Sequence, residues 1–407
     1  MKTRILLCWG YHRKGWITPF EHLNEDFDFV YLFYTTEEEE GQSFTNCKKV
    51  YWSQFSCAQQ ILSTVKPDKI VFMSLYSGYT MALNAAAKRK GIHTFIFQHG
   101  LYKTYQEYRF FELMQKEKEI KDRRQIPDLS NSSDTQLKKS QKRTLSFIFR
   151  SYSVIHWYKI VNQLFFIFVL RREGHYTAMK RVRFSDRIPD SYICFTENNA
   201  TIHKELDKIS DEIIDYTGVP ELDVFFKEVN HGKPLIEGSY YLMVSQPFAQ
   251  NQWWNLGVSV EQENEVCTKL ANWCSSNSSK LVVKLHPENY ESTWLVKHSN
   301  IIYAKELPVA NLMHFAQGVF GSTSTLMLPA VYNKPCFLLL IHNSGFQKKV
   351  RELGLARGAD YLNFTQDEIV FKTNDDKNVE SLEEFEKKYL FKADGKSVER
   401  LREILKS

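Results

Sequence analysis

Two short stretches in the C-terminal half constrain the fold of this chain more than any other feature. Residues 281–287 are Leu-Val-Val-Lys-Leu-His-Pro, a β-branched and aliphatic run that stops at a His-Pro pair. Such a run is typical of a buried strand of a parallel sheet, here with His286 at its carboxyl end. Residues 319–329 are Val-Phe-Gly-Ser-Thr-Ser-Thr-Leu-Met-Leu-Pro, which predicts a short strand, a hydroxyl-rich loop and an apolar helix.

The second stretch places hydroxyl side chains directly before a helix. They are Ser322, Thr323, Ser324 and Thr325, preceded by Gly321. Free backbone N–H groups and the helix dipole favour a phosphate at such a position, and ligands of open α/β sheets bind outside the carboxyl ends of the strands. Taken alone, the hydroxyls could be a helix cap and the His-Pro pair a strand end. Together they predict a phosphate site, to which Lys284 and Pro287 are added as neighbours of His286.

The rest of the chain alternates strand-like and helix-like segments, which predicts parallel sheets built from βαβ units. A length of 407 residues exceeds one ordinary core, and the Pro- and Gly-containing residues 224–238 are typical of a linker. We therefore expect an α/β fold with two Rossmann-type domains whose sheets face a central cleft. The expected boundaries are 1–230 for an acceptor-side domain, 238–385 for a nucleotide-donor domain and 386–407 for a helical tail.

The composition excludes some classes of protein. With 43% hydrophobic and 25% charged residues, the chain is not disordered throughout, and a net charge of +5 does not by itself indicate nucleic acid. Seven scattered cysteines without a C-x-x-C pair indicate reduced cysteines in a cytosolic protein. The apolar segment at the start is too short for a signal peptide. The sequence contains no apolar run of ~20 residues, so a helix that spans a membrane is not expected.

Residues 115–185 interrupt the alternation and are expected to be an insertion in the first domain. The part up to about residue 142 is polar and charged, which favours a mobile segment. Residues 147–170 are aromatic and aliphatic, with basic residues on both sides. Two interpretations stay open: a helix lying on a membrane surface, or a buried helix with solvated ends.

The first domain has its own polar motif at a strand end, Gln98-His99-Gly100. Glycine permits the close approach of a ligand, and a histidine can act as a general base near neutral pH. His99 is therefore the candidate base, although a loop histidine and a turn glycine would give the same sequence. Further candidates for the cleft are His12, Glu107, Glu197 and Gln246, the two glutamates being fallback bases.

The order of the motifs resembles that of a group of bacterial GT-B surface-polysaccharide transferases. The motifs are Gln98-His99-Gly100, Thr196-Glu197-Asn198, residues 217–223, residues 284–287, residues 321–325 and Asn333-Lys334-Pro335. The group includes the sialyltransferases and polysialyltransferases, the capsule Kdo transferases and the CDP-glycerol glycerophosphotransferases. Their His-Pro and Ser-Ser/Thr motifs bind the phosphate of a cytidine nucleotide, which the resemblance assigns here to His286, Ser322, Thr323 and Ser324.

One departure leaves the donor open. Bacterial sialyltransferases usually carry their acidic base in an Asp/Glu-Asp-Gly triplet, whereas Gln98-His99-Gly100 is closer to the Trp-His-Gly of the glycerophosphotransferases. The resemblance implies a metal-independent, inverting glycosyltransferase that moves a sialic acid-like sugar or Kdo from a CMP-activated donor to a glycan or lipid-linked glycan. A CDP-glycerol or CDP-ribitol transferase and a non-catalytic nucleotide-sugar-binding subunit are the alternatives.

The remaining expectations concern cofactors, partners and location. We expect no cofactor and no metal, on the reading that no Asp-x-Asp motif is present to hold one. Nucleic acid is not an expected partner, because the aromatic residues are not interleaved with the basic ones. The expected location is the cytoplasm, with peripheral contact to the inner face of the plasma membrane.

Overall fold

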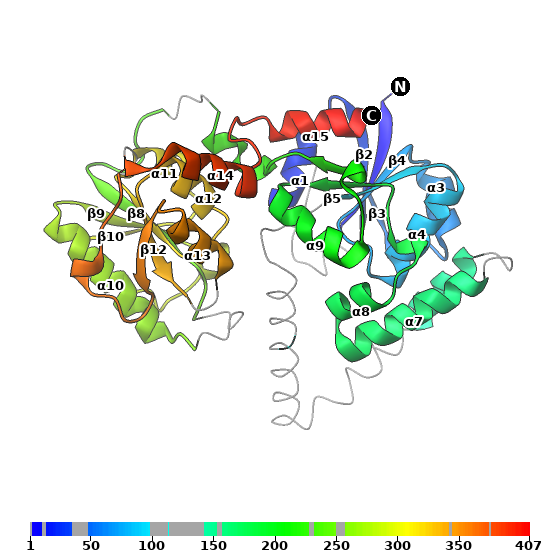
Figure 1. The fold of residues 1–407 in the computed structure, drawn as a ribbon, viewed down its shortest axis with the longest axis horizontal. Helices are drawn as coiled ribbons and strands as arrows, with labels where there is room; N and C mark the ends of the chain where they lie inside the picture. The colour runs from blue at the N-terminus through cyan, green and yellow to red at the C-terminus, as the bar shows by residue number, and fades with distance from the viewer. Residues whose placement is uncertain are drawn as a thin grey trace. The chain divides into compact units, whose positions relative to one another are not determined.

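The computed structural model describes residues 2–9, 14–34, 48–97, 113, 142–152, 157–227, 232–249, 257–341, 344–373 and 376–407. The chain divides into two compact units, each treated separately below (Figure 1). Unit 1 consists of Met1–Glu221 and Ser397–Ser407, and unit 2 of Leu222–Lys396. Each unit contains a parallel β-sheet with helices between its strands, so the predicted α/β class with two Rossmann-type domains is confirmed.

In the described part of unit 1, seven strands form one parallel sheet in the order β3-β2-β1-β4-β5-β6-β7. They are β1 (Thr3–Cys8), β2 (Phe27–Phe33), β3 (Lys48–Tyr51), β4 (Lys69–Phe72), β5 (His93–Phe97), β6 (Ser191–Cys194) and β7 (Ile214–Tyr216). The chain adds β2 and β3 on one side of β1 and then β4 to β7 on the other. The order in which strands are added therefore reverses between β1 and β4, and α/β sheets bind ligands at positions of this type.

The helices of unit 1 are α1 (Lys14–Glu21), α3 (Ala58–Val65), α4 (Gly78–Arg89), α7 (Trp157–Glu173), α8 (His175–Arg181), α9 (Glu197–Asp207) and α15 (Ser397–Lys406). The sequence pattern explains α4 well, because Ser77 caps its first turn by accepting from Thr80 N–H. Gly78 at the start of α4 lies close to another helix, since a Cβ there would be 2.7 Å from Ile148 Cδ1, which would have to shift.

In the described part of unit 2, six strands form a second parallel sheet in the order β10-β9-β8-β11-β12-β13. They are β8 (Tyr240–Val244), β9 (Lys280–Lys284), β10 (Ile301–Ala304), β11 (Val319–Gly321), β12 (Cys336–Leu340) and β13 (Arg357–Asp360). The helices are α10 (Val260–Ser276), α11 (Val309–Phe315), α12 (Met327–Asn333), α13 (Gly345–Glu352) and α14 (Val379–Tyr389). In this sheet the order in which strands are added reverses between β8 and β11.

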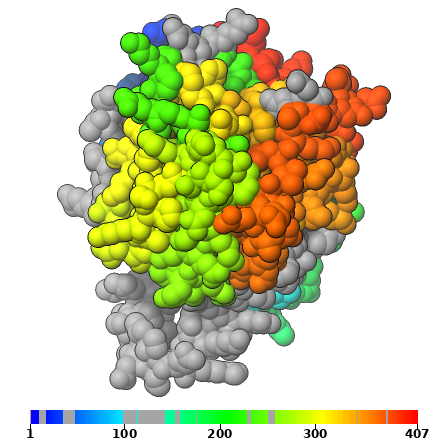
Figure 2. Space-filling model, turned by 90° about the vertical axis from the view of Figure 1, so that its left-hand side faces the viewer, coloured from blue at the N-terminus to red at the C-terminus, as the bar shows by residue number. Residues whose placement is uncertain are grey.

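The first stretch singled out by the sequence is a central strand of this sheet. Leu281, Val282 and Val283 of β9 are almost completely buried, as a continuous apolar run predicts for a strand covered on both faces. Residues of α10 pack in one core with β9 and with Phe364, and Figure 2 shows the yellow-green surface of this part of the chain beside an orange C-terminal segment. Lys269 of α10 lies over the Phe364 ring, with its ammonium 5.6 Å from the ring centroid.

The C-terminal residues do not form one separate tail, which differs from the range 386–407 expected from the sequence. Helix α14 ends at Tyr389 inside unit 2, whereas α15 packs on unit 1. Leu401 and Leu405 of α15 are fully buried, and Arg402 Nε lies 2.8 Å from Asp26 Oδ2. The physical reason is that an amphipathic pattern shows that a helix has an apolar partner but not which sheet supplies it.

The expected insertion contains α7 and α8, which pack against α4 (Figure 1). Part of its apolar stretch is buried, including Phe166 and Val169, and part is exposed, including Phe165 and Phe168. Within the described ranges, no helix combines the length and the apolar character needed to cross a bilayer. The six cysteines that the structure describes are free, and five of them are buried.

Candidate functional site

The candidate phosphate site lies at the carboxyl edge of the sheet of unit 2, where the chain reverses. Val244, the last residue of β8, is paired in register with Lys284 of β9 and with Gly321 of β11. The loops that follow β9, β8 and β11 therefore start side by side. Ligands of parallel sheets bind outside this edge, so the topology supports the position predicted from the two sequence motifs.

Three predicted site residues follow these strand ends at the same distance along the chain. His286, Gln246 and Thr323 each come two residues after the paired positions of β9, β8 and β11. Because neighbouring strands are about 4.8 Å apart, the backbones at His286 and Thr323 are separated by roughly 10 Å, with the end of β8 between them. The two loops therefore start close together, and a phosphate site between them stays a prediction.

His286 is held in a defined orientation. It caps a short 3-10 turn, Pro287–Asn289, and its Nδ1 accepts a hydrogen bond of 3.4 Å from Glu288 N–H. The neutral ring must then carry its proton on Nε2, which can donate to a ligand. Its side chain is 35% exposed, and the Glu288 carboxylate lies 4.0 Å from Nδ1. The sequence identified His286 but not the part played by Glu288.

Lys284 is bound within its own unit. Its ammonium donates to the Tyr290 hydroxyl at 2.9 Å and also to the Lys305 backbone carbonyl. A third, longer contact of 3.5 Å goes to Leu285 O. These contacts connect the end of β9 with the loop after β10, so Lys284 stays a predicted phosphate neighbour whose donors are engaged in this structure.

Gly321 and Ser322 both make contacts within unit 2 that hold the loop before α12 in place. A Cβ at Gly321 would lie 2.3 Å from Met327 Sδ, so the glycine makes room for the first residue of α12. Ser322 is 2% exposed, and its hydroxyl donates to Leu339 O at 2.6 Å. The Ser322 hydroxyl proton therefore joins β11 to β12, and its role as a phosphate ligand stays a prediction.

The remaining hydroxyl residues of the loop, Thr323, Ser324 and Thr325, are half-buried at the sheet edge. Ser324 Oγ accepts a 3.3 Å hydrogen bond from Leu326 N–H and so shapes the turn before α12. The helix itself starts at Met327 and has only seven residues. The phosphate-binding capacity of this loop therefore depends mainly on its hydroxyls and backbone N–H groups, and less on a helix dipole.

Two residues near this edge were missed by the sequence analysis. Glu263 of α10 is 3% exposed and accepts from Ala249 N–H at 3.1 Å, which fixes the loop that contains Gln246. Burial raises the pKa of Glu263 to about 7, and the Ala249 N–H opposes part of that rise. Asn289 is fully buried, and neither its amide oxygen nor its amide nitrogen has a hydrogen-bond partner among the residues that the structure describes. A glutamate in the first turn of a helix gave no signal that it would be buried.

Three aromatic residues, Trp9, Phe97 and Phe195, pack together at the carboxyl edge of the sheet in unit 1 and are buried. The rings of Trp9 and Phe97 are stacked with centroids 6.2 Å apart, and Phe195 meets Phe97 edge to face at 5.4 Å. These three residues come directly before the loops that carry the predicted residues of this domain. His12, Gln98, His99, Gly100 and Glu107 themselves lie outside the described residues. Glu197 is exposed in the first turn of α9, two residues after Phe195.

Two tyrosines at the same edge were also missed. Tyr34 follows β2, and its hydroxyl is 3.0 Å from Ser77 Oγ at the start of α4. The Tyr34 ring stacks on Trp52 with centroids 5.6 Å apart, and both Tyr34 and Tyr76 are 38% exposed. For Tyr34, a tyrosine directly after an apolar strand was the available sequence signal.

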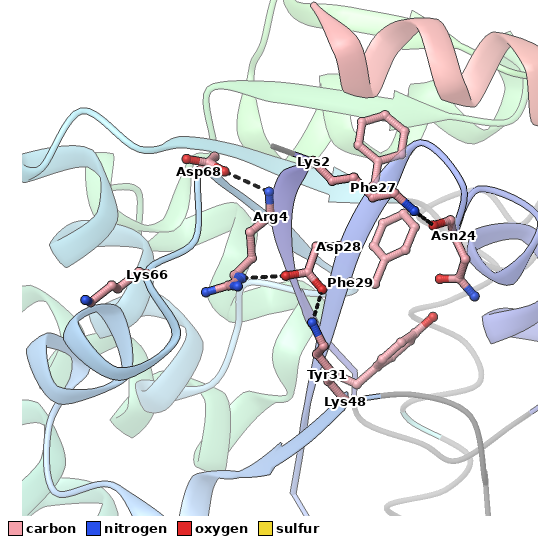
Figure 3. A pocket seen from close by; sticks show the side chains of 10 residues that line it. All are labelled: Lys2, Arg4, Asn24, Phe27, Asp28, Phe29, Tyr31, Lys48, Lys66 and Asp68. Atoms are coloured by element: carbon pink, nitrogen blue, oxygen red, sulfur yellow. Dashed lines mark hydrogen bonds and ion pairs between the residues drawn. The ribbon is translucent and has the colours of Figure 1, made fainter.

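A cavity of about 690 Å³ lies at the opposite, amino-terminal edge of the sheet in unit 1 (Figure 3). It is lined by Lys2, Arg4, Asn24, Phe27, Asp28, Phe29, Tyr31, Lys48, Lys66 and Asp68. Hydrogen bonds from Lys48 and Arg4 lower the pKa of Asp28, and the Arg4 N–H donates to Asp68. Much of the charge is thus neutralised internally, and the cavity is remote from the strand ends where ligands of this fold class bind.

The reading that no Asp-x-Asp motif is present is wrong, because Asp26-Phe27-Asp28 is one. Both carboxylates are bound to cations of unit 1: Asp26 to Arg402, and Asp28 to Arg4 and Lys48. Among the residues that the structure describes, no three His, Cys, Asp or Glu side chains are grouped so as to hold a metal ion.

Solved structures share the fold of the chain at low sequence identity. The UDP-GlcNAc 2-epimerase from Neisseria meningitidis, bound to UDP-GlcNAc, is 12% identical with a TM-score of 0.51, covering 100% of both chains. The wall teichoic acid polymerase TagF, in a histidine-to-asparagine variant soaked with CDPG, is 12% identical with a TM-score of 0.50, covering 100% of this chain and 88% of that chain. These identities show the fold alone. A search of the curated proteins returned no match.

The family comparison is more specific. Residues 33–302, more than half of the chain, match the family described as alpha-2,8-polysialyltransferase (POLYST). This range begins at the end of β2 in unit 1 and ends in β10 of unit 2, and it includes both Gln98-His99-Gly100 and His286. The chain therefore belongs to the alpha-2,8-polysialyltransferase family and is a glycosyltransferase.

Proposed function

We propose that the chain transfers a sialic acid-like sugar or Kdo from a CMP-activated donor to a hydroxyl of a glycan acceptor. The product would be part of a bacterial surface polysaccharide, such as a capsule, an O-antigen or a lipooligosaccharide. The observation that carries this proposal is the shared position of two loops. The loop with His286 and the hydroxyl loop 322–325 begin at one edge of the sheet of unit 2, because Lys284 and Gly321 are both paired in register with Val244.

The proposed reaction is a direct displacement at the anomeric carbon of the donor sugar. The acceptor oxygen forms the new bond to this carbon and loses its proton to a base, while the bond from the carbon to the phosphate oxygen breaks. CMP leaves with the electron pair of that bond. His286 Nε2–H, with Thr323 and Ser324, would donate to the phosphate as its negative charge increases, and such a preorganised donor commonly contributes roughly 3 kcal/mol to lowering the barrier.

His99 is the proposed base. In the sequence His99 comes two residues after Phe97, the last residue of β5. Glu197 and Glu107 are the fallback bases. Stabilisation of the leaving phosphate is assigned to protein side chains, with no metal and no other cofactor taking part.

The proposed partners are the CMP-linked donor and a glycan or lipid-linked glycan. The proposed location is the cytoplasm, with peripheral contact to the inner face of the plasma membrane. Free cysteines at all six described positions support a reducing compartment.

The direct test is His286→Ala. We expect transfer to fall by about 100- to 1,000-fold because a donor to the leaving phosphate is lost, with no change in the unfolding temperature. His298→Ala is the matched control, since His298 precedes β10 at the amino-terminal edge of the same sheet and binds Asn272 and Asn300. Normal transfer by His286→Ala in a folded protein would refute the role.

A second candidate is transfer of glycerol phosphate or ribitol phosphate from a CDP-linked donor. The specific support is the shared fold with TagF, which was soaked with CDPG, together with the Gln98-His99-Gly100 triplet. A third candidate is a non-catalytic subunit that binds a nucleotide sugar. Hydrolysis of the donor in the absence of acceptor would separate an enzyme from such a subunit.

A thermal-shift series with CMP, CDP, UDP and GDP identifies the nucleotide, because a ligand that binds only the folded state raises its stability. We expect a shift with the cytidine nucleotides alone. The donor that is then consumed, CMP-sugar or CDP-alditol, distinguishes the first two candidates. A shift with UDP alone would contradict both.

A further inference from the structure

A stripe of apolar side chains is exposed along one face of α7. Tyr158, Val161 and Phe165 are each 51% exposed, and Phe168 is 56% exposed. Spacings of three and four residues place these side chains on one face of the helix. These four residues form the α7 stripe. Leu145 and Phe149, in the helical residues 142–151, add two more exposed apolar side chains of the same insertion.

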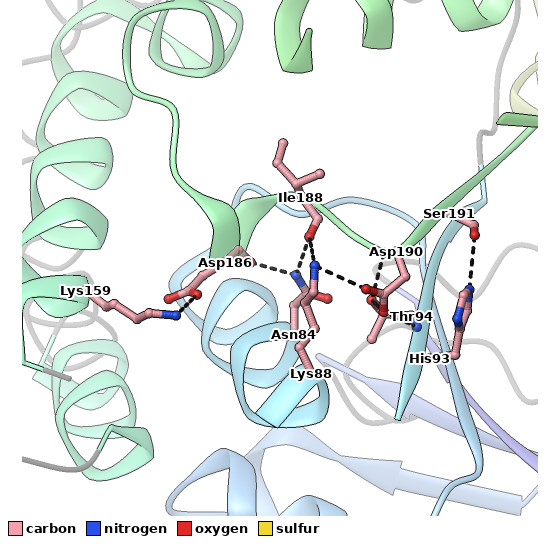
Figure 4. A network of polar contacts seen from close by, with 9 residues as sticks. All are labelled: Asn84, Lys88, His93, Thr94, Lys159, Asp186, Ile188, Asp190 and Ser191. Atoms are coloured by element: carbon pink, nitrogen blue, oxygen red, sulfur yellow. Dashed lines mark hydrogen bonds and ion pairs between the residues drawn. The ribbon is translucent and has the colours of Figure 1, made fainter. Parts of the chain in front are cut away.

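The opposite face of α7 is fixed to unit 1. Phe166 and Val169 are buried against Met81 of α4 and Ala178 of α8. Lys159 Nζ lies 2.7 Å from Asp186 Oδ1, and Figure 4 shows Lys159 reaching across to the segment that Asn84 of α4 also binds. The stripe is therefore the outer side of a docked helix, and rotating it inward would expose the side chains that are now buried.

The sequence around the stripe is rich in positive charge, and one of its cations, Lys159, is paired with Asp186. Residues 142–172 contain six Lys and Arg residues and no Asp or Glu. Since the whole chain carries +5, the remaining residues together carry −1. Arg150 and Arg171 are exposed, and Arg171 follows the stripe by three residues on the same helix. The net positive charge of the protein is thus concentrated beside its exposed apolar face.

We infer that the α7 stripe docks on the surface of an anionic lipid bilayer. A helix that lies in the plane of a bilayer needs apolar and aromatic side chains on one face and cations beside them, and both are present. A second copy of this chain fits poorly, because two such faces would bring the exposed cations Arg150 and Arg171 of one copy against those of the other. The proposal deepens the peripheral location given above by naming the surface and the lipid charge, and it does not depend on which donor is used.

Vesicle binding of the full-length protein tests the inference. Wild type is compared on vesicles of phosphatidylglycerol with phosphatidylcholine and on vesicles of phosphatidylcholine alone. We expect at least tenfold stronger binding to the anionic vesicles. Phe165→Ser/Phe168→Ser should weaken this binding by at least tenfold, because two large apolar side chains are lost from the bilayer boundary.

The matched control is Val379→Ser on α14 of unit 2, a residue that is 67% exposed and outside the stripe. It should bind vesicles like wild type. Arg150→Gln/Arg171→Gln should weaken binding to anionic vesicles by about fivefold for each charge removed, and should change binding to neutral vesicles little. Unfolding temperatures and transfer to a water-soluble acceptor, measured on the same samples, should match wild type for all these variants.

Three results would overturn the inference. They are equal binding by wild type and Phe165→Ser/Phe168→Ser, equal binding to neutral and anionic vesicles, and no vesicle binding by wild type. A dimer that dissociates in the double Phe variant would assign the stripe to a second copy instead. Transfer to the soluble acceptor reports on the proposed function separately, so a failure of one proposal does not imply a failure of the other.

Discussion

The carboxyl edges of the two sheets carry different chemistry. In unit 2 this edge combines the imidazole of His286 with the hydroxyls of Thr323 and Ser324. In unit 1 it begins with the stacked rings of Trp9 and Phe97. Imidazole N–H and hydroxyl groups suit a phosphate, whereas the rings of Trp9 and Phe97 are buried and support the loops that follow them.

The comparison shows that one sheet topology can place different kinds of residue at the same edge. Both sheets reverse their strand order beside the first strand, which opens an edge for a ligand. The residues that follow the strands then decide the ligand. The predictions below test whether donor binding belongs to unit 2 and acceptor chemistry to unit 1, in order of decreasing expected effect.

The strongest test of this division is His99→Ala. A general base commonly contributes 10²- to 10⁴-fold, so we expect transfer to fall by about that factor while affinity for CMP stays unchanged. Single-turnover rates and calorimetric titration with CMP measure the two quantities. His12→Ala should reduce transfer less. Loss of CMP binding in His99→Ala would make His99 a donor ligand and break the division.

Glu263→Gln tests whether the buried carboxyl that holds the loop after β8 makes the stability of the protein depend on pH. Burial raises the pKa of Glu263 from 4.5 to about 7, so the folded state binds its proton more tightly than the unfolded state. The stability this provides is complete below pH 4.5 and is lost as pH rises through 7. Relative to Glu263→Gln, the wild type should therefore lose up to about 3 kcal/mol of unfolding free energy between pH 4.5 and pH 8.

Denaturant unfolding of both proteins across this pH range measures the difference. A glutamine can still accept from Ala249 N–H, so the loop after β8 should keep its position and CMP affinity at pH 8 should persist. A difference that stays constant with pH would show that Glu263 is ionised in the folded state with an ordinary pKa.

Gly321→Ala should disturb both folding and donor binding. The added Cβ would lie 2.3 Å from Met327 Sδ and push the start of α12, at a cost of about 2 kcal/mol in unfolding free energy. Gly358→Ala is the control, because its Cβ would lie 2.4 Å from Leu338 O on β12. We expect both variants to be less stable and only Gly321→Ala to bind CMP more weakly. Equal CMP affinities would separate this loop from the donor site.

The smallest effects distinguish neighbouring hydroxyls. Ser322→Ala removes the bond to Leu339 O and should lower the unfolding free energy by about 1 kcal/mol with unchanged affinity for CMP. Thr323→Val should weaken CMP binding about fivefold, as expected for one hydrogen bond of about 1 kcal/mol. Calorimetry and denaturant unfolding of both variants measure these two effects. If Ser322 is the phosphate ligand instead, Ser322→Ala will weaken CMP binding and Thr323→Val will not.

Much of the fold could be predicted because strand signals are local. The continuous apolar run of β9 and the Gly-Ser-Thr-Ser-Thr turn after β11 were recognised from the chain itself. Edge strand β3 (Lys48–Tyr51) was not, because two lysines and two larger residues give no apolar run, as is common for an edge. The site edge followed from the motifs, since parallel strands end at one side of a sheet.

The sequence by itself determined the fold class, the family resemblance and the position of His286 at a strand end. Only the tertiary structure decided which polar groups are already engaged, as with Lys284 and Ser322, because their partners Lys305 and Leu339 are distant in the chain. It also showed that α7 is buried on one face and exposed on the other. A helix that is apolar all round carries no period that marks its inner side, so only packing against α4 and α8 could define it.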